Sequence, residues 1–163
     1  MAQVDFYLEL GDIKGESTDK KHKEKIELDS FSVSCAQSGT QSSGSGGGAG
    51  KVRFQDLHCT KKMDVASPKL LLACASGQHF PKATLFCRKA GGEQEEFCTW
   101  HLTDVLVSSY QSGGHGHSEI LPVDQVSLNF GKIIMEYGVQ DEKGKVGKKV
   151  KAGWDLKSNC KAD

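Results

Sequence analysis

The glycine-rich stretch at residues 45–52 (SGGGAGKV) is the first candidate for chemistry, because phosphate-binding loops combine glycines with a lysine. The pattern GxxxxGKS or GxxxxGKT needs a glycine where Ser45 stands and a hydroxyl residue where Val52 stands. It also needs a helix after the lysine, because the helix N-terminus binds the phosphate. Ser45 and Val52 do not match this pattern, and after Lys51 apolar and polar residues alternate as in a strand. The stretch therefore does not predict nucleotide binding.

Cysteine and histidine side chains could bind a metal or act as nucleophiles, but their spacing favours neither role. The sequence contains no CxxC pair, which argues against a zinc ribbon and against a thioredoxin-type redox site. Cys98 and His101 lie three residues apart, so in a strand they would point to opposite faces. His115 and His117 share a glycine-rich loop that offers no preorganised third ligand. We expect no enzyme activity, no metal site and no cofactor.

The cysteines are expected to be reduced thiols that pack as small hydrophobic side chains, since the N-terminus shows no secretory signal. They are Cys35, Cys59, Cys74, Cys87, Cys98 and Cys160. The alternative is oxidation to disulfides, which would remove two hydrogens from the mass of the chain for each pair.

The composition excludes several classes of protein. The chain has 163 residues, and its 21 basic and 21 acidic residues give a formal net charge of +0. A neutral chain has no general attraction for nucleic acid or an anionic membrane, so neither is an expected partner. The longest apolar stretches, such as residues 70–75, are far shorter than the ~20 residues that span a bilayer, so we expect no membrane insertion.

Most of the chain shows the period-2 alternation of half-buried β-strands. The predicted strands are residues 4–10, 26–36, 51–61, 82–89, 95–110 and 123–137. The alternation of apolar and polar residues slips by one position near Asp29-Ser30, which indicates a β-bulge. A second bulge is expected at Gly131-Lys132. The Gly-Gly pair within residues 90–93 predicts the turn of a hairpin.

One helix is predicted at about residues 67–76. Ser67 is the expected N-cap, Pro68 suits the first helical position, and Gly77 ends the helix. Between them lies an almost continuous apolar run that predicts a helix covering something apolar, such as the end of a barrel. The fold class is therefore mainly β, an antiparallel β-barrel, closed or nearly closed, with one short flanking α-helix.

We expect residues 1–163 to form a single domain with two unusual segments. Residues 37–50 are almost all small or polar and predict an extended Gly/Ser loop, while residues 141–163 predict a Lys-rich C-terminal tail. Glycine loops admit the backbone of another chain, and long strands offer edges for pairing. These features favour a self-assembling protein that forms rings or stacks. The alternative is a monomeric ligand-binding β-barrel.

Several blocks, in one order along nearly the whole chain, resemble the haemolysin-coregulated protein (Hcp) family, which forms the inner tube of the bacterial type VI secretion system. The blocks are GDIKGES at 11–17, GGGAGKV at 46–52, SPKLLLACASG at 67–77, RKAGGEQ at 88–94, LTDVLVSSYQSGG at 102–114 and VSLNFGKI at 126–133. Most of the cysteines and the His115/His117 pair depart from the family pattern, either by natural drift or by deliberate introduction.

The resemblance implies homohexameric rings that stack into a hollow conduit, which is expelled and can carry effectors. It implies a VgrG-type spike, a contractile sheath and small effectors as partners. It also implies synthesis in the bacterial cytoplasm and secretion through the type VI system without a cleaved signal peptide. The extended loop would contact the next ring; its residues here are Gly39, Ser45, Gly46, Gly47, Gly48, Ala49, Gly50 and Lys51.

Overall fold

The computed structural model describes residues 3–39, 50–89 and 94–163. The elements, in chain order, are β1 (Val4–Leu10), β2 (Ile26–Leu28), β3 (Ser30–Ser32), β4 (Cys35–Ala36), β5 (Arg53–Phe54), β6 (Leu57–Lys62), α1 (Ser67–Ser76), β7 (His79–Lys89), β8 (Glu96–Gly113), β9 (Val123–Gln140), β10 (Val146–Asp155) and β11 (Cys160–Ala162). A mainly antiparallel β fold with one helix in the described residues confirms the predicted fold class.

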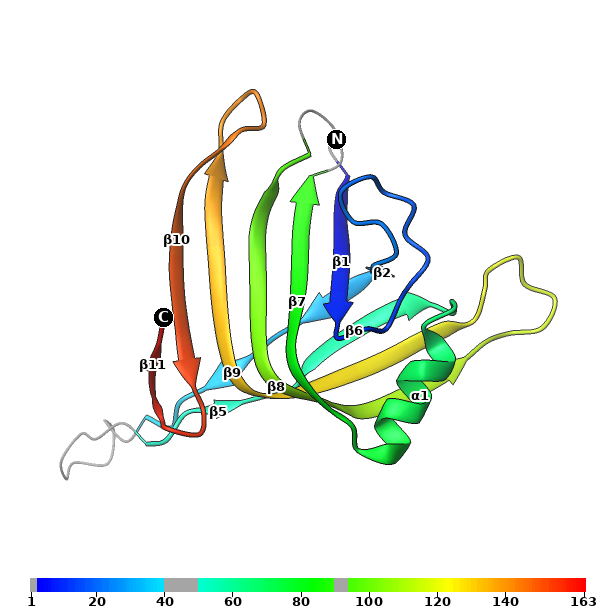
Figure 1. Cartoon of the computed structure of the whole chain (residues 1–163), viewed down its shortest axis with the longest axis horizontal. Coiled ribbons are helices and arrows are strands. Elements are labelled where there is room, and N and C mark those ends of the chain that lie inside the picture. The colour runs from blue at the N-terminus through cyan, green and yellow to red at the C-terminus, as the bar shows by residue number, and fades with distance from the viewer. Residues whose placement is uncertain (1–2, 40–49, 90–93) are drawn as a thin grey trace.

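The main sheet runs in the order β11-β10-β9-β8-β7-β1-β2, and every pairing in it is antiparallel (Figure 1). β6 lies beside this path, because it pairs with β3 on one side and with the first part of β9 on the other. β4 and β5 form a separate small sheet. The predicted hairpin is β7–β8, and its predicted turn at 90–93 lies outside the described residues.

The sheet curls into a barrel that is not closed, so full closure, one of the two expected forms (closed or nearly closed), is corrected. Within the described residues no pairing joins β11 to β2, the two ends of the path. Instead the predicted parity change at Asp29 divides one extended segment into two parts, of which β2 pairs with β1 and β3 pairs with β6. The backbone N–H of Asp29 donates to the carbonyl of Thr60 at 2.8 Å, so the segment passes from one strand to the other at this residue.

A shared bend replaces the bulge that was predicted at Gly131-Lys132, and that prediction was wrong. Thr103 pairs with Lys132 and Val105 with Phe130, so the β8–β9 register stays in step across Gly131. Opposite Gly131 lies Asp104, whose φ of 54° is left-handed. β7, β8 and β9 bend side by side (Figure 1). In both β8 and β9 the buried positions shift by one residue at the bend. Seen in one strand alone, this shift in the alternation looks like a bulge.

Helix α1 ends as predicted but begins differently. Gly77 adopts a left-handed φ of 64°, and its N–H caps the helix at the carbonyls of Ala73 and Cys74. Ser67 is not the N-cap, because the cap position is Ala66, without a side-chain cap bond. The Ser67 hydroxyl instead donates to Asp124 Oδ2 at 2.5 Å and accepts from the N–H of Asp64 at 3.0 Å. The hydroxyl thus joins the helix to β9.

Side chains fill the interior between the curled sheet and the helix. Leu8, Leu85 and Leu102 from neighbouring strands are buried there, and Leu70 on α1 packs in the same core. A filled interior does not favour the alternative of a ligand-binding barrel. The segment that was expected to be a Lys-rich tail instead forms β10 and β11, which extend the sheet beyond β9.

Candidate assembly surfaces

The predicted ring-stacking loop begins and ends at the small sheet of β4 and β5. Gly39, Gly50 and Lys51 are exposed. A Cβ on Gly50 would collide with the Ser38 hydroxyl unless that side chain rotated, so residues 38 and 50 approach closely at the base of the loop. The other predicted residues, Ser45, Gly46, Gly47, Gly48 and Ala49, lie outside the described residues. The stacking role of this loop therefore stays a prediction.

An exposed apolar face on β9 and β10 continues the face that forms the core. We call it the sheet patch, and its members are Met135, Tyr137, Val139 and Val150. Along β9 the exposed fraction rises steadily, from 4% at Ile133 to 38% at Met135, 45% at Tyr137 and 68% at Val139. Val150 pairs with Tyr137 across the two strands and is 72% exposed. Alternate residues share one face, so this face leaves the core and meets solvent.

A hollow of about 240 Å³ lies where the core meets the sheet patch. It is lined mainly by apolar side chains, which are Phe54, Trp100, Ile133, Met135, Ala152 and Trp154. The indole N–H groups of Trp100 and Trp154 are buried and have no hydrogen-bond partner in the described part of the chain. Buried polar groups normally find a partner, so this edge of the core is incomplete in the isolated chain.

A second exposed apolar group lies at the opposite end of the long axis of the molecule. We call it the end patch, and its members are Met63, Val65, Ile120 and Leu121. Met63 follows β6, and its N–H donates to the Pro122 carbonyl at 2.9 Å, which holds the β8–β9 connection beside it. In Figure 1 this connection is the yellow loop on the right, whereas β10 lies on the left. The two patches therefore lie on elements at opposite sides of the molecule in this view.

Helix α1 contributes a further exposed apolar pair. Its buried side is formed by Leu70 and Ala73, whereas Leu71 and Leu72 point to solvent. The helix therefore does not plug the barrel with all its apolar side chains, as its sequence suggested. It covers the core with one face only.

A clamp of polar residues holds residues 11–25 against the sheet. The buried Arg88 guanidinium on β7 donates to both carboxylate oxygens of Asp19 and, at 3.1 Å, to the Tyr7 hydroxyl. His22 stacks on the Tyr7 ring at 4.6 Å between centroids, and its Nε2 lies 2.6 Å from Glu96 Oε1. Because Tyr7 and Arg88 lie on the strand face opposite the core, the clamp fastens this loop outside the sheet.

The clamp also shifts the protonation of its members. The hydrogen bond from Arg88 lowers the pKa of the Asp19 carboxyl. Burial lowers the pKa of His22, and the nearby Lys25 charge lowers it further, against the opposing effect of Glu96. Burial opposes ionisation of Glu96, but hydrogen bonds from its own backbone and from His22 lower the pKa of Glu96 overall. The clamp is therefore built around ionised carboxylates and a neutral imidazole.

A second buried ion pair fixes the start of α1 to the start of β9. Lys61 Nζ lies 3.0 Å from Asp124 Oδ2 and 2.8 Å from Asp64 Oδ1, and Lys61 and Asp124 are almost fully buried. Ser67 completes the group through its bond to Asp124. Each charged group in the cluster has several partners, as buried charges require. The cluster is a structural anchor that supports the elements beside the end patch.

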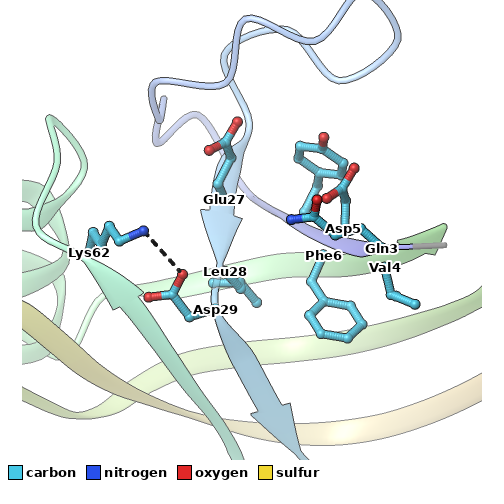
Figure 2. A pocket seen from close by; sticks show the side chains of 9 residues that line it. Gln3, Val4, Asp5, Phe6, Glu27, Leu28, Asp29 and Lys62 are labelled. Atoms are coloured by element: carbon cyan, nitrogen blue, oxygen red, sulfur yellow. Dashed lines mark ion pairs between the residues drawn. The ribbon is translucent and has the colours of Figure 1, made fainter. Parts of the chain in front are cut away.

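An acidic hollow of about 270 Å³ lies beside β1 and β2. Figure 2 shows Asp5 and Glu27 on one side of this strand pair and Phe6 on the other, while Lys62 points toward Asp29. Lys62 Nζ and Asp29 Oδ1 are 3.9 Å apart and both side chains are exposed, so this ion pair is weak. The hollow gathers no set of converging groups that could perform a reaction.

The described ranges are residues 3–39, 50–89 and 94–163. In these ranges no group of three or more histidine, cysteine or acidic side chains is placed to hold a metal ion. His115 and His117 are both exposed, and neither belongs to such a group. Within the same ranges no helix is long and apolar enough to cross a membrane.

The sheet patch and the end patch were missed by the sequence analysis. A signal for the sheet patch was nevertheless present, because Val150, Ala152 and Trp154 alternate with Lys149 and Lys151 as in a strand. The lysines hid this alternation, since they favour a solvated tail. No comparable signal marks the end patch, whose residues lie in two connections.

Known proteins resemble this chain over almost its full length. The family model described as "Type VI secretion system effector, Hcp" matches residues 7–137. Protein hcp1 of Pseudomonas aeruginosa is 46% identical over 161 residues, covering 98% of this chain and 99% of that protein. The solved structure of a type six secretion system protein has a TM-score of 0.94 at 37% identity, covering 98% of this chain and 100% of that one.

Hcp1 from Salmonella typhimurium is a further similar structure, with a TM-score of 0.83 at 36% identity, covering 99% of this chain and 100% of that one. The sequence relative and both structures agree with the resemblance found in the sequence blocks. The chain therefore belongs to the Hcp family and is a structural protein of the type VI secretion tube.

Proposed function

We propose that six copies of this chain close into a ring in which the sheet patch of each copy contacts the end patch of the next. The observation that carries the proposal is the presence of two different exposed apolar patches at opposite ends of the long axis. Hcp proteins assemble into rings, which agrees with this arrangement. The number six comes from the resemblance to the family.

The geometry of the patches favours a ring over a two-fold dimer. A two-fold dimer brings the same surface of both copies together, whereas contacts between unlike surfaces continue from copy to copy into a closed ring or an open filament. The sheet patch and the end patch are unlike surfaces. Covering the sheet patch would also remove Val139 and Val150 from water and would complete the edge of the core beside Trp100 and Trp154.

Stacking of the rings into a hollow tube is the second part of the proposal. The loop that leaves β4 and returns to β5 would reach the neighbouring ring, with Gly39, Gly50 and Lys51 at its exposed base. A spike of the VgrG type, a contractile sheath and small effectors are the partners that the family resemblance implies. The chain would be made in the bacterial cytoplasm before its secretion.

Light scattering after size exclusion, together with negative-stain images, tests the ring. The wild-type chain is expected to form hexamers with a central hole. Val150→Asp in the sheet patch and Met63→Asp in the end patch should each give monomers. Mixing the two variants should give one-to-one dimers without rings, because each variant keeps the one patch that the other lacks.

Leu72→Asp is the matched control, since it adds the same charge to an exposed apolar side chain on α1, outside both patches. This variant should form rings as the wild type does. Monomeric wild-type protein at high micromolar concentration would contradict the ring. Dimers formed by Val150→Asp alone would contradict the contact between unlike patches.

A further inference from the structure

Two buried cysteines lie directly opposite each other on neighbouring strands. Cys87 on β7 pairs with Cys98 on β8, and their exposed fractions are 2% and 5%. Directly opposed residues of an antiparallel pair have Cα atoms about 4.5–5.5 Å apart, within the roughly 4.4–6.8 Å range of disulfides. From this juxtaposition we propose that Cys87 and Cys98 form a redox-active pair, which oxidation converts into a disulfide across the β7–β8 hairpin.

The thiols already interact in the reduced chain. A hydrogen bond between the two side chains lowers the pKa of Cys98 and raises the pKa of Cys87. The thiolate is the species that attacks a disulfide, and we assign Cys98 as the attacking thiol because it is the more exposed of the two. Cys98 also pairs with Tyr137, a half-exposed member of the sheet patch, so it lies beside the open end of the core.

Cys59 provides an internal comparison. It is as buried as Cys87, but its paired residues are Phe31 on β3 and Val126 on β9, so no second thiol faces it. Burial raises the pKa of Cys59 to about 12. Cys59 should therefore stay a thiol under conditions in which Cys87 and Cys98 react.

The proposed reaction is exchange with a low-molecular-weight disulfide such as oxidised glutathione. The Cys98 thiolate attacks one sulfur of glutathione disulfide, which forms a mixed disulfide and releases one glutathione thiolate. Cys87 then attacks the Cys98 sulfur, forming the Cys87–Cys98 bond and releasing the second glutathione. The two protons lost by the cysteines end on the two released thiols, and the two electrons reduce the glutathione disulfide.

The disulfide would link β7 covalently to β8, and β7 carries Arg88 of the clamp. Cys87 precedes Arg88, and the β7–β8 register shifts between these two residues. Arg88 in turn holds Asp19 and the loop of residues 11–25. Thiols persist in a reducing compartment and disulfides in an oxidising one, so a secreted copy would form this disulfide after it leaves the cell.

The test uses the full chain with the two exposed cysteines removed (Cys35→Ala, Cys160→Ala), which leaves Cys59, Cys74, Cys87 and Cys98. The folded protein is equilibrated in glutathione buffers of rising oxidised fraction, quenched with acid, alkylated in denaturant and weighed. We expect the number of alkylated thiols to fall by two, with peptide mapping that links Cys87 to Cys98. No loss of thiols at any glutathione ratio, or a link between other cysteines, would overturn the proposal.

Three further variants assign the roles. Cys59→Ala is the matched control, because it removes a buried thiol yet should still lose two thiols on oxidation. Cys87→Ala should stop at a mixed disulfide of Cys98 with glutathione, whereas Cys98→Ala should form no bond. If Cys98→Ala lost as many thiols as the background chain, the assignment would be wrong, whatever the mutations do to stability.

Discussion

The two halves of β9 show how the same type of strand can serve as core or as surface. Its first half pairs with β6 and β8, and Val126, Leu128 and Phe130 are buried there. Its second half pairs with β10 and β8, and the inward-facing Met135, Tyr137 and Val139 become steadily more exposed. The division falls at the bend beside Gly131.

The difference teaches that composition does not decide which half is covered. Both halves carry apolar residues on alternate positions. The first half is covered because its apolar side chains join the core that also contains Leu70 and Ala73 of α1, and because β6 pairs along its edge. In the described residues nothing comparable covers the end of the second half, where Tyr137 and Val139 are exposed. An apolar face that is left open on a stable sheet is available for another copy of the chain.

The largest loss in the free energy of unfolding is expected from Asp124→Ala, at the start of the first half of β9. The change leaves the buried Lys61 charge with Asp64 as its remaining carboxylate, and breaking a buried pair costs about 3–5 kcal/mol. Urea unfolding should show this loss of the free energy of unfolding. Asp29→Ala is the control, because its ion pair with Lys62 is exposed and should be worth less than about 1 kcal/mol. Equal losses in both variants would contradict the role assigned to the anchor.

Leu128→Ala tests the covered face of the first half directly. Leu128 is fully buried, so the cavity should cost about 2–5 kcal/mol in the free energy of unfolding. The measurement is again urea unfolding, carried out on a Val150→Asp background so that assembly does not contribute. A loss below 1 kcal/mol would show that the first half is no better packed than the second.

The pH dependence of stability separates the polar clamp from the apolar patches. Burial lowers the pKa of His22 in the folded chain, so the unfolded chain binds the proton more tightly. Stability should therefore be full above the unfolded pKa near 6.5 and should fall as the pH drops below it. The slope cannot exceed one proton, or about 1.4 kcal/mol per pH unit.

His22→Gln is the variant that checks this slope. It should flatten the plot of stability against pH between about pH 7.5 and 5.5. The loss at lower pH from Asp19, whose pKa is lowered mainly by the hydrogen bond from Arg88, should persist. An unchanged slope in the variant would assign the pH dependence to another group. The measurement is thermal or urea unfolding across the pH range.

The smallest effect on stability is expected from Val150→Ala in the second half. Val150 is 72% exposed, so the free energy of unfolding of the single chain should change by no more than about 0.5 kcal/mol. The same change should shift the ring–monomer equilibrium toward monomer, as measured by sedimentation. A large loss of stability without a change in assembly would reverse the comparison between the two halves.

Several parts of the fold could be predicted because their signals are local. The alternation of residues 4–10 predicted β1, and Pro68 with Gly77 predicted the extent of α1. The bend at Gly131 was misread because three strands turn together, which no single strand reveals. The N-cap assignment of Ser67 failed because Asp124, a residue far along the chain, binds its hydroxyl.

The sequence by itself determined the strand faces, the helix and the membership of the family, since these depend on local periodicity and on blocks of residues in order. Only the tertiary structure decided which face is covered, because coverage depends on elements that are distant in the chain. It placed Cys87 opposite Cys98, joined Lys61 to Asp124, and left Val150 in solvent. Strand alternation shows which residues share a face, but the pairing of distant strands decides what that face meets.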